Sequence, residues 1–198
     1  MSTGVVIVDS GGANIASLRC ALARLDCDPL LSADPEIISN ASHVILPGVG
    51  AAADAMERLD RLALTPVIPS LTQPVLGICL GMQLLAQHSA EDDTTCLGIT
   101  GDDASLLTTT DDLPVPHMGW NQIHTLGRSA LLRGIEAGAF FYFVHSYALP
   151  ISDSSIARCH YGQDFAAIMQ RDNFFGTQFH PERSARTGAR LLANFIEL

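Results

Sequence analysis

The chain has 198 residues, of which 47% are hydrophobic, and this size and composition are typical of a single folded domain over residues 1–198. Its 21 acidic and 11 basic residues give a net charge of −10, which argues against nucleic-acid binding, because phosphates need basic stripes. No apolar run approaches the roughly 20 residues of a membrane span. Residues 1–5 lack the basic region of a signal peptide, and five cysteines without paired spacing favour reduced thiols and a cytoplasmic location.

The first predicted unit is a strand, a turn and a helix. The continuous apolar run at residues 4–9 predicts a buried parallel strand, and apolar residues at helical spacing predict an amphipathic helix over residues 15–25. Asn14 is the expected N-cap of this helix. Gly11 and Gly12 could belong to a phosphate-binding loop, but the G-x-G-x-x-G spacing is missing, so a nucleotide site is the weaker interpretation.

A second strand and helix are predicted at residues 43–46 and 51–62. The connection Pro47-Gly48-Val49-Gly50 is either an ordinary turn or a loop whose N–H groups face a ligand. The carboxyl ends of parallel strands gather at one edge of a sheet, where ligands bind. A second glycine-rich strand end at that edge would therefore favour the functional interpretation.

The stretch Gly77-Ile78-Cys79-Leu80-Gly81-Met82-Gln83 provides such a strand end. It follows a short apolar strand at residues 73–76, and residues 84–86 are read as helix. A cysteine between two small residues on a strand-to-helix turn is typical of the nucleophile elbow, where the helix N-terminus favours the reactive thiolate. The alternative is a buried cysteine that acts as a small apolar residue.

The middle of the chain is more polar. Residues 89–116 are rich in Ser, Thr, Asp and Gly and predict a surface excursion with short strands, whose acidic clusters, including residues 108–112, are solvated. Residues 116–121 are then read as a loop that carries the single tryptophan, Trp120. A lone tryptophan belongs either to the core or to an interface with a partner, and both possibilities stay open.

The C-terminal part predicts further strands and a final helix. The aromatic run at residues 140–147 is expected to be a central strand, because both of its faces are apolar. Three more strands and a helix follow, at residues 156–161, 166–170, 174–179 and 185–198. The chain is thus expected to form a three-layer, doubly wound, flavodoxin-like α/β fold. Its sheet is mostly parallel, with an antiparallel extension from part of residues 90–125.

His180-Pro181-Glu182 supplies a possible base and orienting group. On an extended backbone, His180 and Glu182 would point to the same side, so that the carboxylate binds one imidazole nitrogen and leaves the other for Cys79. This is the nucleophile, base and orienter arrangement of hydrolytic triads. The alternatives are a surface polar pair and a Cys/His/Glu zinc site. Zinc is disfavoured because a third strong ligand is missing.

With these motifs the sequence resembles the class I (triad) glutamine amidotransferases. The elbow at residues 77–83 and the Phe179-His180-Pro181-Glu182 run match the class, and Pro47-Gly48-Val49-Gly50 matches its oxyanion strand. The runs at residues 116–121, 142–147 and 173–184 resemble one branch of the class. Members of that branch supply ammonia for histidine biosynthesis to a separate cyclase subunit that is a (β/α)8 barrel, and they form a heterodimer with it.

The resemblance implies roles for individual residues. Cys79 would attack the side-chain amide of L-glutamine, His180 would transfer protons, and Glu182 would hold the imidazole. Other implied contacts fall into three groups: oxyanion donors at Gly48, Val49, Gly50 and Leu80; glutamine contacts at Gln83, Glu91, Ser146 and Tyr147; and partner contacts at Asn14, His117, Met118 and Trp120. No cofactor, metal, nucleic acid or membrane is implied.

Three other functions share part of this pattern. Other class I amidotransferases have the same elbow and His-Pro-Glu run, but many are fused to a synthetase. A redox sensor would need Cys79 without His180 and Glu182. A peptidase on the same fold would hydrolyse peptides instead of glutamine.

Overall fold

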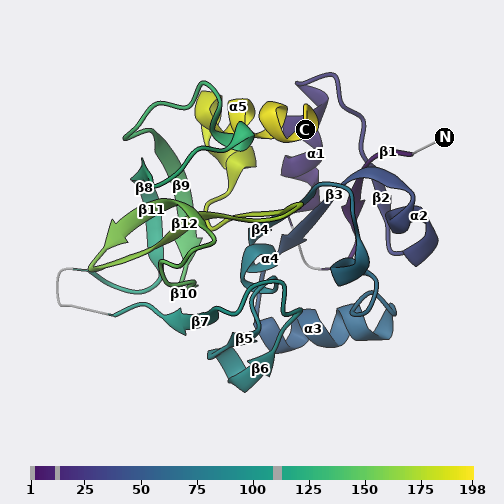
Figure 1. The fold of residues 1–198 in the computed structure, drawn as a ribbon, viewed down its shortest axis with the longest axis horizontal. Coiled ribbons are helices and arrows are strands. Elements are labelled where there is room, and N and C mark those ends of the chain that lie inside the picture. The colour runs from purple at the N-terminus through teal and green to yellow at the C-terminus, as the bar shows by residue number, and fades with distance from the viewer. Residues whose placement is uncertain (1–2, 12–13, 109–112) are drawn as a thin grey trace.

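Residues 3–11, 14–108 and 113–198 are described by a computed structural model of the chain (Figure 1). These residues form a nine-stranded sheet in the order β2-β1-β3-β4-β13-β12-β11-β8-β9 and a small sheet in the order β10-β7-β5-β6. Gly12 of the first turn and residues 109–112 of the acidic cluster lie outside the described residues. None of the described helices is long and apolar enough to cross a lipid bilayer.

One half of the large sheet is parallel, and it brings distant segments to a common edge. Its strands are β2 Leu30–Ser32, β1 Thr3–Val8, β3 Ala41–Gly48, β4 Val75–Cys79 and β13 Phe174–Thr177. In this register Gly48 lies opposite Cys79, and Thr177 lies opposite Ile78 on the other side of β4. The chain therefore leaves β3, β4 and β13 at the same edge, as expected for the ends of parallel strands.

The other half is antiparallel and consists of β12 Gln163–Arg171, β11 Ser155–Tyr161, β8 His117–Thr125 and β9 Phe140–His145. The expected class of fold, a mostly parallel core sheet with an antiparallel extension, is confirmed. Part of residues 90–125 belongs to the extension through β8, as predicted, and residues 140–171 supply its other strands. Residues 117–121, however, were predicted wrongly as a loop, because the Gly and Pro signals hid a strand that pairs along its length with β9.

The aromatic strand β9 is an edge strand, contrary to the prediction that it is central. Its inward residues Phe141 and Phe143 are fully buried, whereas Phe140 is 51% exposed. The prediction was wrong because the outer face of β9 is apolar and yet partly exposed to solvent. Aromatic side chains on an exposed sheet face are a feature of interaction surfaces as well as of cores.

Helices cover both faces of the sheet. α1 Ile15–Ala23 and α5 Ala185–Ile196 pack Leu18, Leu22 and Phe195 into one core, while α2 Pro35–Ser39 and α3 Ala52–Arg61 bury Ile38 and Leu59 in the other. In Figure 1 α1 and α5 lie together on one side and α3 lies on the opposite side. The three-layer arrangement agrees with the prediction, although β2 and α2 were not anticipated from the sequence.

The small sheet forms the predicted excursion. It contains β5 His88–Ser89, β6 Thr94–Thr95, β7 Asp103–Leu106 and β10 Tyr147–Ala148. The helix α4 Leu80–Gln83 ends earlier than expected, so the assignment of residues 84–86 to a helix is wrong. The carbonyls of residues 84–86 instead accept hydrogen bonds from the N–H groups of residues 97–100. The loop that precedes β7 thus replaces the continuation of the helix.

Candidate active site

Cys79 occupies a strained position between β4 and α4. Its φ of 55° and ψ of −113° lie in a region that non-glycine residues rarely adopt, at a cost of about 1–3 kcal/mol. The flanking glycines are needed for close packing. A Cβ on Gly81 would lie 1.9 Å from the Leu46 carbonyl oxygen, and one on Gly77 would lie 2.6 Å from that of Gly81. The small residues let α4 pack directly on β3 and hold the sharp turn in place.

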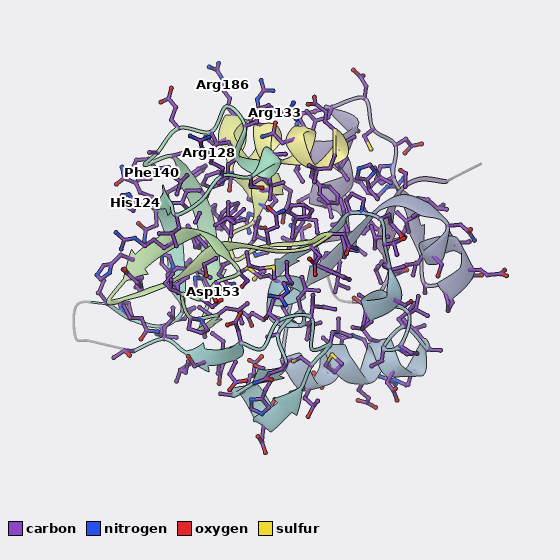
Figure 2. All side chains as sticks on the ribbon, in the orientation of Figure 1. His124, Arg128, Arg133, Phe140, Asp153 and Arg186 are labelled. Carbon is purple, nitrogen blue, oxygen red and sulfur yellow. The ribbon has the colours of Figure 1, made fainter. Side chains whose placement is uncertain are left out.

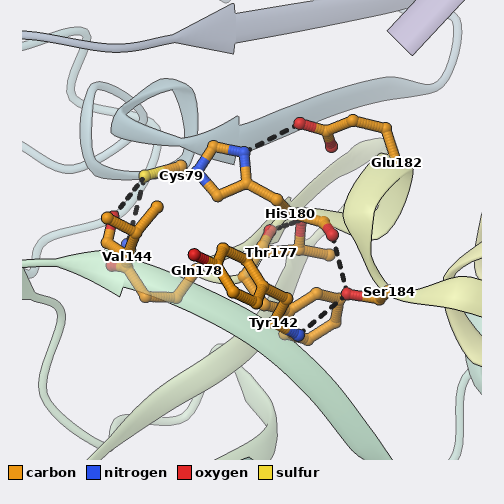
Figure 3. A network of polar contacts seen from close by, with 9 residues as sticks. Cys79, Tyr142, Val144, Thr177, Gln178, His180, Glu182 and Ser184 are labelled. Atoms are coloured by element: carbon orange, nitrogen blue, oxygen red, sulfur yellow. Dashed lines mark hydrogen bonds and ion pairs between the residues drawn. The ribbon is translucent and has the colours of Figure 1, made fainter. Parts of the chain in front are cut away.

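His180 joins Cys79 to Glu182. The His180 Nδ1 and Glu182 Oε1 atoms are 2.9 Å apart, and both side chains are almost fully buried. Figure 3 shows the imidazole ring between the Cys79 sulfur and the Glu182 carboxylate. Burial disfavours the charged imidazole, but hydrogen bonds with Cys79 and Glu182 outweigh it and raise the pKa of His180 to about 10. The site therefore stabilises a protonated imidazole beside the sulfur.

The local geometry of this pair differs from the expected one. Residues Pro181–Arg183 form a single 3-10 turn, so Glu182 is not on an extended backbone. Only His180 is extended, with φ −96° and ψ 99°. The turn, which proline at its first position favours, folds the carboxylate back onto the ring.

The edge of β9 fixes the position of His180. The His180 N–H donates to the Tyr142 carbonyl at 2.9 Å. The Ser184 hydroxyl accepts from the Tyr142 N–H at 2.9 Å and donates to the His180 carbonyl at 2.7 Å (Figure 3). The segment after β13 therefore occupies part of the free edge of β9. Ser184 was missed by the sequence analysis, since nothing in a lone serine after His-Pro-Glu-Arg indicates this role.

Two further groups contact the sulfur of Cys79. Its thiol donates to the Val144 carbonyl at 3.7 Å, and the amide nitrogen of Gln178 donates to the sulfur at 3.8 Å. Gln178 is fully buried in the segment between β13 and His180. Sequence reasoning named neither group, although Gln178 lies only two residues before His180.

A cavity of about 300 Å³ opens next to Cys79 and His180. It has the size of a small-molecule site. Val49, Gly50 and Leu80 of the predicted oxyanion set line it, as do all four predicted glutamine contacts, Gln83, Glu91, Ser146 and Tyr147. Pro116, Val144 and His145 also line it and were not predicted as site residues.

The predicted oxyanion residues come from two segments, the start of α4 and the loop after β3. Leu80 is the first residue of α4, so its N–H is one of the unpaired donors at a helix start. Gly50 has a φ of +91° and lies at the cavity. Gly48, opposite Cys79 in the sheet, lines a second and much smaller cavity together with Asn14 and Glu182.

The predicted glutamine contacts are already engaged in hydrogen bonds. Gln83 donates to the Tyr147 carbonyl at 2.7 Å and to the Gln178 side-chain oxygen at 3.0 Å. Glu91 Oε2 accepts from the Ala52 N–H at 2.8 Å, at the start of α3. One carboxylate oxygen of Glu91 thus holds the helix that follows the glycine loop, and its other oxygen takes no part in this bond.

The predicted partner contacts separate into exposed and buried residues. Met118 and Trp120 are 63% and 52% exposed on β8, and Asn14 is exposed after the first turn. His117 is 3% exposed, so its side chain does not reach the surface that Met118 and Trp120 form. Phe140, at the start of β9, is also exposed, and Figure 2 shows Arg128, Arg133 and Arg186 around the α5 end.

The zinc alternative finds no support in the geometry of the described residues. Among them, no three His, Cys, Asp or Glu side chains converge as a metal site would require. Glu182 instead binds the imidazole nitrogen of His180.

A cysteine on a strand-to-helix elbow, facing a histidine–carboxylate pair at the carboxyl edge of a parallel sheet, defines a cysteine hydrolase of the triad type. Residues 6–198 match the family model Glutamine amidotransferase class-I. Over 195 residues the chain is 50% identical to the imidazole glycerol phosphate synthase subunit HisH of Shigella flexneri, with coverage of 98% of this chain and 99% of that protein. The chain therefore belongs to the class I glutamine amidotransferase family and, within it, to the HisH branch.

Two further comparisons agree. The HisH 1 protein of Vibrio vulnificus (strain YJ016) is 46% identical over 200 residues, with 98% of each chain covered. A solved structure of PurLQS from Thermotoga maritima superposes with a TM-score of 0.74 at 18% identity. The superposition covers 100% of this chain and 99% of that one, and at this identity the likeness bears on the fold alone.

Proposed function

We propose that this chain is the glutaminase subunit of an imidazole glycerol phosphate synthase. It hydrolyses L-glutamine to glutamate and ammonia and passes the ammonia to a cyclase subunit, which makes imidazole glycerol phosphate and AICAR in histidine biosynthesis. The two subunits form a heterodimer in the cytoplasm, and residues 1–198 act as one glutamine amidotransferase domain. The observation that carries the proposal is the Cys79, His180 and Glu182 triad beside a cavity of about 300 Å³.

The first half of the reaction forms a thioester. His180 takes the thiol proton of Cys79, and the sulfur adds to the side-chain amide carbon of glutamine. His180 then gives its proton to the nitrogen as the carbon–nitrogen bond breaks, and ammonia leaves. Glu182 keeps Nδ1 of His180 protonated and supports the positive charge on the ring. In the second half, water loses a proton to His180, attacks the thioester carbon and releases glutamate and the Cys79 thiol.

The oxyanion of each tetrahedral intermediate is stabilised by N–H donors. The Leu80 N–H at the start of α4 and an N–H of the Gly48-Val49-Gly50 loop are the proposed donors, and one such donor contributes roughly 3 kcal/mol. We further propose that the cyclase subunit, docking at Asn14, Met118 and Trp120, reorients this loop. Gly50 suits a peptide rotation, because it lies at a positive φ in open space.

The amino-acid end of glutamine needs groups of opposite charge or polarity. The free oxygen of Glu91 is the proposed partner of the α-ammonium group, because a carboxylate is the natural partner of a cation. Gln83, Ser146 and Tyr147 are the proposed contacts for the remaining polar atoms. All four residues line the cavity.

The test is steady-state glutamine hydrolysis by the purified chain, measured alone and with the cyclase subunit. Wild-type activity is expected to rise when the cyclase is added, and Cys79→Ala is expected to lose at least about a thousandfold in kcat. Glu182→Gln is expected to lose less than Cys79→Ala, since it leaves nucleophile and base in place. Substantial activity of Cys79→Ala would exclude Cys79 as the nucleophile, and full activity of the isolated wild-type chain would exclude activation by the partner.

A further inference from the structure

Two buried histidines, His117 and His145, lie beside the active site and take no part in the triad. Their Nδ1 and Nε2 atoms, respectively, are 3.0 Å apart. His145 Nδ1 lies 2.9 Å from the Tyr147 carbonyl, and the Asn121 amide nitrogen lies 3.3 Å from His117 Nε2. The four residues form a continuous chain from the outer part of β8 to the wall of the glutamine cavity.

The acceptor at one end, the Tyr147 carbonyl, fixes the direction of every hydrogen bond among these four residues. The Tyr147 carbonyl can only accept, so His145 carries its proton on Nδ1 and accepts on Nε2. His117 must therefore donate from Nδ1, which leaves its Nε2 to accept from Asn121. Asn121 suits this role, because its second amide hydrogen donates to the His160 carbonyl at 3.0 Å and its oxygen accepts from the Gln122 N–H.

Neutral rings are essential to this scheme. Burial lowers the pKa of His117 to about 4 and that of His145 to about 3, so both rings are uncharged near neutral pH. A protonated His145 would present a second donor to the His117 donor, and the chain would be broken. At ordinary pH the two rings therefore pass hydrogen bonds in one fixed direction, from Asn121 through His117 and His145 to the Tyr147 carbonyl. We call this arrangement the relay, and it is not a pH switch.

The network of hydrogen bonds continues from the Tyr147 carbonyl to the sulfur of Cys79. The Tyr147 carbonyl also accepts from the Gln83 amide at 2.7 Å, and the same Gln83 nitrogen donates to the Gln178 side-chain oxygen at 3.0 Å. This contact fixes which end of the Gln178 amide faces Gln83. The Gln178 nitrogen is then left pointing at the Cys79 sulfur, 3.8 Å away (Figure 3).

We propose that His117 and His145 are positioning residues of the glutaminase, which, through the Tyr147 carbonyl and Gln83, hold the Gln178 amide as a hydrogen-bond donor to the Cys79 sulfur. A donor at this place stabilises the thiolate over the thiol. His180, with Glu182 behind it, is the charged group that faces the sulfur from the other side. The proposal rests on the assignment of Cys79 as the nucleophile, and it adds a second, neutral contribution to its activation.

The ring stacking of His117 offers a matched set of variants. Its ring stacks between Phe143 and Tyr161, with centroids 4.9 Å and 4.1 Å away. His117→Phe keeps this stacking and removes the donor, whereas His117→Asn places an amide donor near the position of Nδ1. Tyr161→Phe is the control, because it keeps the stacked ring and loses only the bond from its hydroxyl to the Pro114 carbonyl.

The experiment measures alkylation of Cys79 by iodoacetamide in the full-length chain as a function of pH. Modification is quantified by mass spectrometry on the peptide that contains Cys79, since the exposed Cys20 would react as well. In His117→Phe the rate at pH 7 is expected to fall about three- to tenfold, as for loss of one modest hydrogen bond, with the pH midpoint moved upward. His117→Asn should recover much of the rate, and Tyr161→Phe should match the wild type.

A merely structural role of the relay would lower thermal stability and leave the pH midpoint of alkylation unchanged. An unchanged midpoint in folded His117→Phe therefore overturns the proposal. If that variant does not fold, Gln178→Met decides the question, because it removes the last donor directly; a wild-type alkylation profile there overturns the proposal as well. If the wild-type chain fails to hydrolyse glutamine even with the cyclase, the proposed function fails, whereas the alkylation comparison still decides the relay.

Discussion

Ser184→Ala tests how His180, the proposed catalytic base, is held. The Ser184 hydroxyl is fully buried and bridges the Tyr142 N–H of β9 and the His180 carbonyl. Alanine removes the hydroxyl without adding volume, so the change isolates these two hydrogen bonds. It leaves the Tyr142 N–H without its partner, whereas the His180 carbonyl still accepts from the Arg183 N–H at 3.0 Å.

The expected magnitude follows from the Tyr142 N–H that is left without its partner. A buried polar group that loses its partner costs about 1–3 kcal/mol, so the free energy of unfolding should fall by about 1–3 kcal/mol. The folded state survives this, because domains of this size have about 5–15 kcal/mol of stability. The His180 backbone keeps its bonds to the Tyr142 carbonyl and from the Arg183 N–H but loses the hydroxyl that links it to the Tyr142 N–H. A small displacement of the imidazole should lower kcat about 10- to 100-fold.

Urea unfolding and steady-state kinetics in the presence of the cyclase measure the two effects separately. Ser39→Ala is the control, since its exposed hydroxyl bonds the Pro35 carbonyl in α2, far from the triad, and it should change stability by less than about 0.5 kcal/mol. Wild-type kcat in a destabilised Ser184→Ala would refute the positioning argument. Wild-type stability would refute the assignment of the hydroxyl as a buried bridge.

Four other changes have defined expected outcomes. The pKa of His180 is raised from 6.5 to about 10, so the protonated ring stabilises the fold fully below pH 6.5, and this stabilisation is lost as pH rises through about 10. The free energy of unfolding of the wild type should therefore fall between these pH values. In His180→Asn the part of this fall that is due to the imidazole should be missing. Glu91→Gln keeps an acceptor for the Ala52 N–H but removes the charge, so the KM for glutamine should rise about tenfold or more with a smaller change in kcat, and an unchanged KM would exclude Glu91 as the ammonium partner. Gly81→Ala should lower stability by several kcal/mol, because its Cβ meets the Leu46 carbonyl, whereas Gly101→Ala has open space around the new atom and serves as the comparison in thermal melts. Trp120→Ala should weaken cyclase binding by about 2 kcal/mol or more in calorimetry while leaving the melting temperature of the isolated chain nearly unchanged, and equal affinity would exclude it from the interface.

The elbow and the contact between His180 and Glu182 could be predicted because their signals are local. Cys79 lies between two small residues at a strand end, and His180 and Glu182 are two positions apart, so short motifs contain the chemistry. The common edge of β3, β4 and β13 then follows from a general property of parallel sheets. The expected backbone geometry of this pair was nevertheless wrong, since Glu182 reaches His180 from a 3-10 turn and not from an extended segment.

The contacts that complete the site are non-local and could not be inferred in this way. The place of β9 at the sheet edge depends on pairing with β8, and its aromatic outer face imitates a buried one. The hydrogen bonds of Ser184 depend on that edge, and those of Gln178 depend on Gln83, which is 95 positions away along the chain. The histidine pair gives no sequence signal either, because His117 and His145 are 28 positions apart and resemble ordinary strand residues.

Cys79 and His180, the proposed nucleophile and base, are anchored in unequal surroundings. Cys79 ends a strand in the middle of the sheet, whereas His180 is bonded to the outermost strand, β9. Opening of that strand alone would withdraw the imidazole and leave the strained cysteine turn intact. A molecule in this state would still be labelled by small electrophiles at Cys79 but would turn over no amide, so covalent labelling by itself overcounts the active sites of a preparation.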